Sequence, residues 1–400
     1  MGKNADMLAQ ASKYLYPNYK PLPMVLERGQ GAELWDVEGK RYLDLCAGVA
    51  VCSVGHAHPD HVRALAEQAG RLAHVSNYFY NDVNIRLAAR LCERTGFARA
   101  FFCNSGTEAN EALFKLARRH FWAKGEVERT QFIAFHNAFH GRTMGALQLT
   151  GTPKYREGFG DIGAVSHFKF GDLAAVKAAL DHRVAAVVVE PVQGEGGVMP
   201  APEGFLRGLR EACDAAGALL FCDEVQTGIG RTGAFFGFES SGIRPDAVAL
   251  AKGLGGGIPV GAFLCTEALA QALPPGTHGS TFGGNPLASA SAMSVLDIID
   301  REGLVAAAAE KGAYLGKLLG ELAARLPKVC EGERGAGLLR GLVLREGMVA
   351  RDILPKLAEQ GVLVIAAGDR VLRFCPALVV TKAQLEEGVE KVGAVLSAMA

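Results

Sequence analysis

The sequence predicts an α/β protein: a large domain with a mainly parallel central sheet, and a smaller α+β domain. Between about residues 98 and 265, short β-rich runs alternate with helical patterns, and this alternation indicates a parallel sheet covered on both faces. Glycine supplies 50 of the 400 residues, above the usual share of about 7%. The glycines cluster at the ends of apolar runs, where the backbone can approach a ligand closely.

The elements follow in order along the chain. The first 48 residues contain a turn-linked β pattern, GAELWDVEGKRYLDL, and are expected to pack with the small domain. Residues 49–296 are expected to form the large domain, with strands at RAFFC, QFIAFH, VAAVVVEP, ALLFCDEV, DAVALA and GAFLCT. After Pro286 a long helical pattern leads into residues 297–400, the expected small domain, which ends in a helix after Thr381.

Composition restricts the class of partner. The 42 basic residues balance the 42 acidic ones, and no basic run is interleaved with aromatics, so we expect no nucleic-acid partner. We also expect no membrane partner, since no apolar stretch is long enough to span a bilayer and the N-terminus lacks a signal-peptide core. Nine cysteines without a C-x-x-C pair indicate reduced thiols and a cytoplasmic location. The expected ligand is a small molecule.

The word FFCNSGTEANEALFKLAR predicts an anion site. It reads as strand, tight turn and helix, so Ser105, Gly106 and Thr107 offer N–H groups and hydroxyls at a helix N-terminus, a natural place for phosphate. Ser105 with Glu108 also fits a helix capping box, which would explain the same residues without a ligand.

Asp223 and Gln226 follow the apolar strand in LLFCDEVQTG. A carboxylate at a strand end beside a phosphate site could pair with a cationic ring nitrogen, although a simple turn cap is also possible. The same stretch matches G-x-G-x-x-G at Gly228, Gly230 and Gly233, which would suggest a dinucleotide site. No convincing helix pattern follows these glycines, and none of the positions 20 residues beyond them is acidic, so we disfavour that function.

The word FHNAFHGRT ends another predicted strand. Phe139 could stack on a flat cofactor and Arg142 could bind a carboxylate, while core packing and a surface ion pair are the alternatives. The histidines of FHNAFH and HAHPDH have no matching cysteine or acidic cluster. We therefore expect them to cap and pack, and we expect no metal site.

Lys252 stands between an apolar run and four glycines in VALAKGLGGGIPVGA. Burial lowers the pKa of a lysine and makes its amine a nucleophile able to form a Schiff base with a carbonyl. A surface lysine would leave the glycines unexplained. A phosphate cradle, a ring-nitrogen carboxylate, a stacking aromatic and such a lysine are together what pyridoxal 5'-phosphate requires.

The sequence resembles the class III aminotransferases, pyridoxal-phosphate enzymes of fold type I. The matching words are NSGTEANE, FHGRT, EPVQGEGG, DEVQTGIGRTG, AKGLGGGIPVGA and HGSTFGGNPLA, in that order, and the likeness covers nearly the whole chain. It implies a homodimer with shared active sites and two half-reactions, with pyridoxamine phosphate as the stored form of the cofactor. A catalytically silent regulator of the same fold is a second hypothesis, which the intact motif residues disfavour.

The resemblance also assigns roles by position. Lys252 would carry the cofactor, and Asp223 would pair with its ring nitrogen. Gln226 would bind the ring hydroxyl, and Phe139 would stack on the ring. Ser105, Gly106 and Thr107 would surround the phosphate, and Thr281 would reach the phosphate of the other subunit.

For the substrates, the resemblance implies that Glu195 masks Arg373 for the amino donor and releases it to bind the α-carboxylate of 2-oxoglutarate. Arg142 would bind the far carboxylate of the donor, and Ser280 would lie near the donor at the phosphate end of the site. Val49 stands where enzymes for free ornithine carry a tyrosine, which fits an acylated α-nitrogen, whereas Tyr19 in NYKPLP resembles the ornithine enzymes.

What the resemblance implies at these positions favours transfer of the δ-amino group of N2-acetylornithine to 2-oxoglutarate, which would yield glutamate and belong to arginine biosynthesis. Donors left open are N-succinyl-diaminopimelate, succinylornithine, ornithine and 4-aminobutyrate.

Overall fold

The computed structural model describes residues 2–399, and a seven-stranded sheet forms its centre. The strand order is β4-β12-β11-β10-β7-β5-β6; β12 is antiparallel to both neighbours and the other strands are parallel to one another. The mainly parallel sheet is therefore confirmed, and β6 joins the six predicted strands. Their bounds are β4 Arg99–Cys103, β5 Gln131–Phe135, β6 Val165–Phe168, β7 Val184–Val189, β10 Leu219–Asp223, β11 Ala247–Leu250 and β12 Gly261–Cys265.

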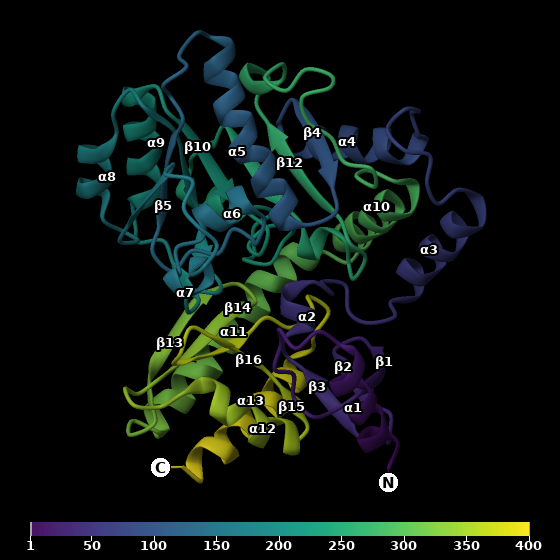
Figure 1. Ribbon diagram of the computed structural model, residues 1–400. Helices are drawn as coiled ribbons and strands as arrows, with labels where there is room; N and C mark the ends of the chain where they lie inside the picture. The colour runs from purple at the N-terminus through teal and green to yellow at the C-terminus, as the bar shows by residue number, and fades with distance from the viewer. Residues whose placement is uncertain (1, 400) are drawn as a thin grey trace.

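Helices cover both faces of this sheet (Figure 1). On β10, Phe221 joins the cluster that contains helix α5 (Gly106–Ala123), while Leu220 and Cys222 join the cluster that contains helix α9 (Phe205–Ala216). Successive side chains of a strand point to opposite faces, so both faces of β10 are buried. This explains why the strand words are continuously apolar and do not alternate.

Two four-stranded sheets form the rest of the fold, and two strands make a short ribbon. The orders are β1-β2-β3-β15 and β13-β14-β17-β16, with β8 paired to β9. Because β15 of the C-terminal region pairs with β3, the N-terminal segment lies against that region, as Figure 1 shows. The bounds are β1 Leu26–Gln30, β2 Glu33–Asp36, β3 Arg41–Asp44, β8 Val192–Gln193, β9 Met199–Pro200, β13 Cys330–Ala336, β14 Leu339–Leu344, β15 Val362–Leu363, β16 Ile365–Ala367 and β17 Val371–Phe374.

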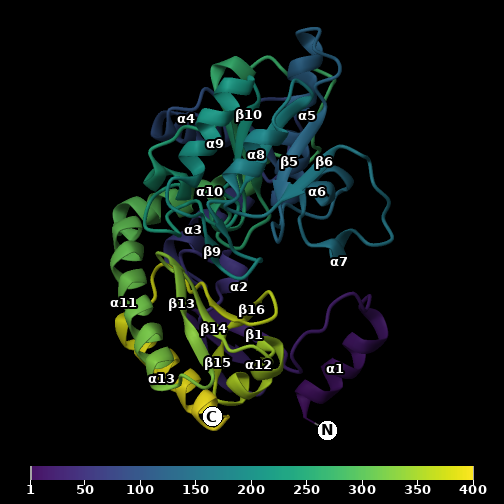
Figure 2. The same cartoon turned by 90° about the vertical axis from the view of Figure 1, so that its left-hand side faces the viewer.

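The remaining helices surround these sheets, and α1 stands apart from the body in Figure 2. They are α1 Lys3–Tyr14, α2 Ala47–Ala50, α3 Pro59–Arg71, α4 Asp82–Thr95, α6 Met144–Leu149, α7 Pro153–Arg156, α8 Leu173–Ala179, α10 Pro286–Arg301, α11 Leu304–Arg325, α12 Ala350–Glu359 and α13 Lys382–Ser397. The expected domain limit between residues 296 and 297 falls inside α10, and the domain limits stay a prediction. Over residues 2–399, no helix combines the length and apolar character needed to cross a membrane.

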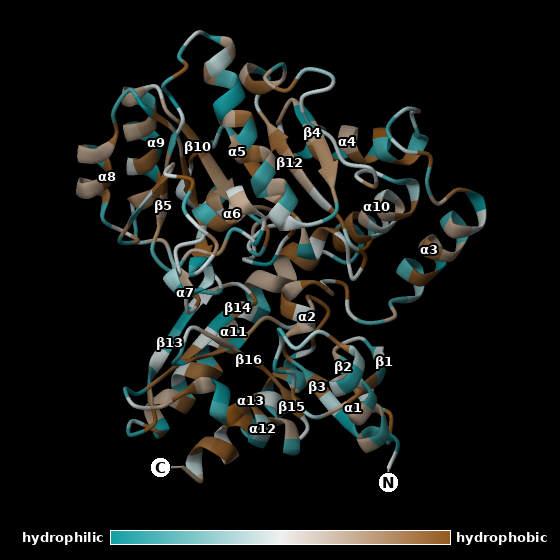
Figure 3. Cartoon of the chain, viewed as in Figure 1, coloured by the Kyte–Doolittle hydropathy of each residue, from teal (hydrophilic) through white to brown (hydrophobic). Residues whose placement is uncertain are grey.

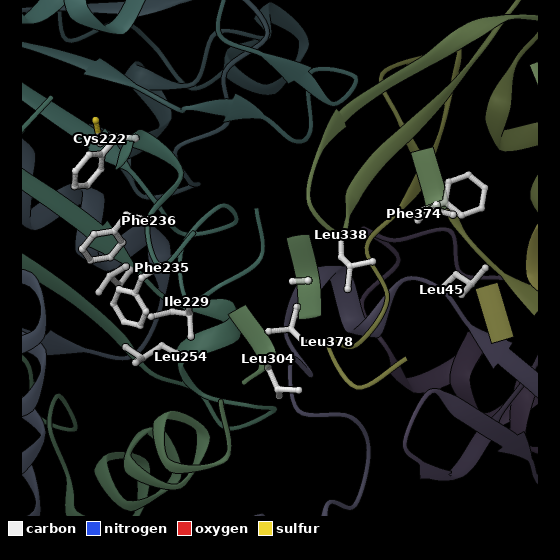
Figure 4. Packing of buried hydrophobic residues seen from close by; sticks show 14 of the residues in the cluster. Leu45, Cys222, Ile229, Phe235, Phe236, Leu254, Leu304, Leu338, Phe374 and Leu378 are labelled. Carbon is white, nitrogen blue, oxygen red and sulfur yellow. The ribbon is translucent and has the colours of Figure 1, made fainter. Parts of the chain in front are cut away.

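One hydrophobic cluster runs through both halves of the molecule. Figure 3 shows the apolar strands of the central sheet, and Figure 4 shows Leu304, Leu338 and Leu378 lying between the two halves. All three are at most 4% exposed. Burial of large aliphatic side chains contributes roughly 1.5–3 kcal/mol each, so this junction is a stabilising part of the core.

Two glycines of the G-x-G-x-x-G match, Gly230 and Gly233, serve this junction. A Cβ on Gly233 would lie 2.8 Å from the Cβ of Ala309 in α11, and a Cβ on Gly230 would lie 3.2 Å from Val305. Both glycines have positive φ, and a 3-10 helix, η1 (Gly237–Ser241), follows them in place of the long helix that a dinucleotide site needs. These glycines allow helix packing, which argues against the dinucleotide function.

Glu224 joins the end of β10 to η1. Its Oε1 accepts a hydrogen bond from the N–H of Phe238 at 2.9 Å, and its Oε2 accepts from the N–H of Gly237 at 2.9 Å and from the hydroxyl of Thr227 at 2.6 Å. The residue is 1% exposed, and burial raises its pKa to about 7.

Removing this carboxyl should change how stability depends on pH. The folded protein holds the Glu224 proton more tightly than the unfolded chain, so the free energy of unfolding falls as pH rises from 4.5 to about 7, by up to about 1.4 kcal/mol per pH unit. We expect the free energy of unfolding of Glu224→Gln not to fall in this way. The difference between its unfolding temperature and that of the wild type should therefore increase as the pH is raised from 5.5 to 7.5. The variant Glu346→Gln, at an exposed residue, should follow the wild type. Parallel profiles for Glu224→Gln would contradict the prediction.

Candidate active site

A cavity of about 430 Å³ opens at the carboxyl edge of the central sheet. Because the parallel strands end at one edge, the residues that follow them meet there. β4 leads to Ser105, β5 to Phe139, β7 to Glu190, β10 to Asp223 and β11 to Lys252. The cavity is lined by Val51, Asn104, Ser105, Gly106, Thr107, Asn110, Phe139, His140, Gly141, Arg142, Glu190, Glu195, Asp223, Val225, Gln226, Ala251, Lys252, Gly257, Ile258, Pro259 and Val260.

The N-terminus of α5 forms one end of the cavity. The Ser105 hydroxyl accepts a hydrogen bond from the N–H of Glu108 at 3.3 Å and donates to its carboxylate at 2.8 Å, so the cap exists. The N–H groups of Gly106 and Thr107 have no acceptor within the helix, because they belong to its first turn. The Thr107 hydroxyl accepts from the N–H of Arg142 at 2.8 Å and holds that loop beside the helix. The cap therefore leaves the N–H groups of the first turn open to an anion.

Asp223 is held rigidly beneath the cavity. Its Oδ2 accepts hydrogen bonds from the Asn110 amide and from His140 Nδ1, both at 2.7 Å, while its Oδ1 accepts from the N–H of Val225 at 2.9 Å. It is 4% exposed. Sequence reasoning assigned no such role to Asn110 or His140, although both lie in the words NSGTEANE and FHGRT that it singled out.

Lys252 begins the 3-10 helix η2 (Lys252–Leu254) directly after β11, with φ of 41°. Burial lowers its pKa, and in the described part of the chain its Nζ has no hydrogen-bond partner. Two of the glycines behind it are closely packed: a Cβ on Gly255 would lie 2.0 Å from the carbonyl oxygen of Ile258, and a Cβ on Gly256 would lie 2.6 Å from the Val295 side chain. The lysine therefore points into the cavity from a loop that larger residues could not form.

An ion pair forms another wall. Arg373 Nη1 donates to Glu195 Oε1 at 2.6 Å and to Gln226 Oε1 at 3.2 Å. Burial acts against both charges, yet the charge of each partner outweighs it, so the pKa of Glu195 is lowered and that of Arg373 is raised. Glu195 and Gln226 line the cavity whereas the buried Arg373 does not. The carboxylate thus covers the guanidinium.

Glu190 is a second buried carboxyl that sequence reasoning missed. Its Oε2 accepts a hydrogen bond from the N–H of Phe139 at 3.1 Å. Burial, and then the charge of Asp223, raise its pKa well above the ordinary range. A glutamate at the end of a valine-rich strand was the available signal, and its neutral form suits the apolar wall beside Phe139.

Phe139 and Arg142 both reach the cavity. Phe139 is half-buried, and the exposed Arg142 places its guanidinium carbon 4.0 Å from the ring centre of Tyr155 and 5.4 Å from that of Phe139. Stacking on two rings fixes the direction of the guanidinium while its N–H groups stay free for a carboxylate.

Five predicted residues do not line this cavity in the single chain, and Arg373, which Glu195 covers, is one of them. Tyr19 is 82% exposed, and Val51 lines the cavity in place of Val49. Ser280 and Thr281 line a separate hollow of about 990 Å³, although the Ser280 hydroxyl accepts a hydrogen bond from Asn104 at 3.2 Å beside the cavity rim. Sequence spacing could not separate Val49 from Val51, since both lie in one irregular turn.

The histidine motifs have structural contacts. His58 caps α3 by accepting from the N–H of Asp60 at 3.3 Å, and buried His61 contacts the Ser294 hydroxyl at 2.7 Å. Across the described chain, no group of three histidine, cysteine or acidic residues is placed to hold a metal ion.

The cavity suits pyridoxal phosphate. Free N–H groups stand at one end for a phosphate, a buried carboxylate stands below for a ring nitrogen, and an unpartnered amine stands on the loop for an aldehyde. A Cβ on Gly106 would lie 2.7 Å from Val225, so glycine keeps the space between the helix end and this wall.

Comparison with known proteins gives a consistent result. Residues 14–396 match the family model for "Aminotransferase class-III". The chain is 50% identical over 386 residues to the acetylornithine aminotransferase of Myxococcus xanthus, covering 96% of each chain. Among solved structures it is similar to N-acetylornithine aminotransferase from Stenotrophomonas maltophilia K279a, with 38% identity and a TM-score of 0.85 over 98% of this chain and 99% of that one. It is also similar to ornithine aminotransferase from Toxoplasma gondii ME49, with 34% identity and a TM-score of 0.95 over 100% of this chain and 96% of that one.

A methyl group at Gly194 should disturb the cavity wall. A Cβ there would lie 1.8 Å from Gln226 Oε1, so Gly194→Ala must displace the amide that contacts Arg373. We expect a loss of about 1–3 kcal/mol in the free energy of unfolding, measured by urea denaturation. Gly70→Ala, in α3 with open space around it, should be neutral or stabilising by up to about 1 kcal/mol. Equal stability of the two variants would show that Gln226 relaxes freely.

Proposed function

This chain belongs to the class III aminotransferases and is a pyridoxal-phosphate-dependent transferase, and on that basis we propose that it moves the δ-amino group of N2-acetylornithine to 2-oxoglutarate. The products are N-acetylglutamate 5-semialdehyde and glutamate, a step of arginine biosynthesis. The observation that carries the proposal is the 50% identity to an acetylornithine aminotransferase across 96% of both chains, together with a cavity that contains each group this chemistry needs.

The cofactor site is proposed residue by residue. Gly106 and Thr107 would hold the phosphate through their N–H groups, and Phe139 would stack on the ring. Asp223 would hold a proton at the ring nitrogen, since its two hydrogen-bond donors keep the carboxylate in place. Gln226 would reach the ring hydroxyl. When bound, pyridoxal phosphate supplies an aldehyde and an electron-withdrawing ring.

Lys252 would bind the aldehyde and move the proton. Because burial lowers its pKa, its amine exists without a proton more often than that of a solvated lysine. An amine that has no competing hydrogen bond can take a proton from the donor carbon and return it elsewhere, which is general acid–base catalysis by one group.

Two unlike substrates must use one cavity in turn. Arg142, exposed at the rim and stacked on Tyr155, would bind the α-carboxylate of acetylornithine, whose reacting amine lies at the far end of the chain. Glu195 covers Arg373 and would keep it from that donor. For 2-oxoglutarate, whose carboxylate adjoins the ketone, Glu195 would move aside and Arg373 would bind the carboxylate as a forked pair.

A homodimer is the proposed assembly. The hollow that contains Ser280 and Thr281 is also lined by Tyr78, Phe79 and Tyr80, which are 72–95% exposed. Exposed aromatic patches of this kind mark protein interfaces. We propose that a second copy covers the patch and that Thr281 then reaches the phosphate of the neighbouring site. The nine cysteines are all free thiols, which supports a cytoplasmic location.

A single-turnover comparison of donors tests the function. The protein would be mixed with N-acetylornithine, ornithine, succinylornithine, N-succinyl-diaminopimelate and 4-aminobutyrate at matched concentrations, and loss of the visible absorbance of the bound cofactor would be followed. We expect acetylornithine to react at least tenfold faster than ornithine, because its acylated α-nitrogen is neutral whereas the α-ammonium group of ornithine would lie beside the Arg142 guanidinium.

Lys252→Ala is the control, and it should lose both the visible absorbance and turnover. Faster reaction with ornithine or 4-aminobutyrate would show that acetylornithine is not the preferred donor, while the membership of the class III aminotransferases would stand. No reaction with any donor would favour a catalytically silent protein.

Glu195 controls access to Arg373, so its removal should change substrate preference. In Glu195→Gln the charge that holds Arg373 is lost, and glutamate, whose carboxylate adjoins its amine, should react at least tenfold faster relative to acetylornithine. The measurement is the ratio of the two single-turnover rates. Exposed Glu203→Gln should keep the wild-type ratio. An unchanged ratio in Glu195→Gln would exclude the masking role.

A further inference from the structure

Residues 47–50 form one turn of left-handed helix beside the active site. All four have positive φ, between 46° and 64°, and the N–H of Ala50 donates to the carbonyl of Cys46 at 2.9 Å. L-residues adopt this conformation singly and rarely in succession, and β-branched Val49 is especially unsuited to it. Such a turn persists only where its surroundings impose it, and this occurs mostly at functional sites.

Asp44, at the end of β3, holds the start of the turn. Its Oδ1 accepts hydrogen bonds from the N–H of Cys46 at 2.9 Å and of Ala47 at 2.8 Å, and its Oδ2 pairs with His56 Nε2 at 2.7 Å. Asp44 is 1% exposed, and its hydrogen bond to His56 raises the pKa of the imidazole to about 10. At neutral pH the pair is therefore a charged bridge across the turn.

His56 is fixed in turn by the N-terminal sheet. Its N–H and carbonyl exchange hydrogen bonds with the carbonyl and N–H of Gly31, both at 2.8 Å. A Cβ on Gly29 would lie 2.7 Å from the Cβ of His56, so only glycine at this place lets the histidine approach β1. The bridge thus transmits the position of the N-terminal sheet to the left-handed turn.

The far side of the turn contacts the loop that begins at Lys252, here called the Lys252 loop. The Ser53 hydroxyl donates to the carbonyl of Gly253 at 2.8 Å in a buried contact, and a Cβ on Gly253 would lie 3.7 Å from the Ala50 carbonyl oxygen. Val51 lines the cavity from the same segment. Gly253 follows Lys252, whose own φ is positive, so both segments hold unfavourable backbone angles where they meet.

We propose that His56 and Asp44 are positioning residues, which press the left-handed turn 47–50 against the Lys252 loop and thereby aim the lysine amine at the cofactor aldehyde. The reaction they assist joins Lys252 Nζ to the aldehyde carbon as a C=N bond and releases one water. The proposal depends on the cofactor and not on the identity of the amino donor.

The test separates capture of the cofactor from its covalent attachment. Full-length protein freed of cofactor is mixed with pyridoxal phosphate, attachment is trapped with borohydride, and the modified fraction is read by mass spectrometry. In parallel, the Kd of 4'-deoxypyridoxine 5'-phosphate is measured; this compound keeps the ring and phosphate but has no aldehyde. We expect His56→Ala to slow attachment at least tenfold while the Kd of the analogue changes by less than about twofold.

Three further variants complete the design. His56→Gln, whose amide can still donate to Asp44, should recover attachment to within about threefold of the wild type. Asp44→Asn, which keeps an acceptor for the two N–H groups but loses the charge, should slow attachment less than His56→Ala. His58→Gln removes a neighbouring histidine that caps α3 and should change neither quantity.

Two outcomes would overturn the proposal. One is wild-type attachment in both His56→Ala and Asp44→Asn. The other is an equal loss of attachment and analogue binding, which would mean that the whole cavity had collapsed. Neither measurement uses an amino donor, so an error in the proposed donor would leave the result unaffected.

Discussion

The convergence of parallel strands at one edge of the central sheet determines the chemistry of this protein. The inner strands β5, β7, β10, β11 and β12 are buried on both faces, so they carry polar residues at their ends. The carboxylate of Asp223 and the amine of Lys252 follow adjacent strands, and the N-terminus of α5 follows β4. Groups that are far apart in the sequence are thereby held within one cavity, without any of them interrupting the core.

Burial sets the electrostatics of that cavity. It lowers the pKa of Lys252 and raises that of Glu190, while Glu195 and Arg373 keep their charges by pairing with each other. An uncompensated charge in such a place would cost several kcal/mol, so each group is paired, neutral or held by hydrogen bonds. In the proposed reaction, opening of the ion pair would require a substrate carboxylate to replace Glu195 as the partner of Arg373.

Glycine provides the close contacts on which this arrangement depends. Gly194 makes room for the Gln226 amide, and Gly106 makes room for Val225. The cavity therefore depends on missing side chains as well as on the polar groups that line it. Part of the high glycine content seen in the sequence has this specific physical use.

Much of this could be predicted from the sequence. Apolar runs with polar residues at their ends located six strands of the sheet, and the residue types at those ends indicated Lys252, Asp223, Phe139 and the α5 N-terminus as site residues. These are local signals, because a strand, a cap and a buried lysine each depend mainly on neighbouring residues.

Only the tertiary structure decided the contacts between distant segments. The hydrogen bonds of Asn110 and His140 to Asp223, and the bridge from Asp44 to His56, join elements whose spacing carries no pattern. The structure also places Val51 at the cavity, where the sequence indicated Val49. Between Asp44 and His56, residues 47–50 form a left-handed turn with positive φ at all four positions. Local sequence cannot encode such a turn, because the surrounding fold supplies the energy that holds it.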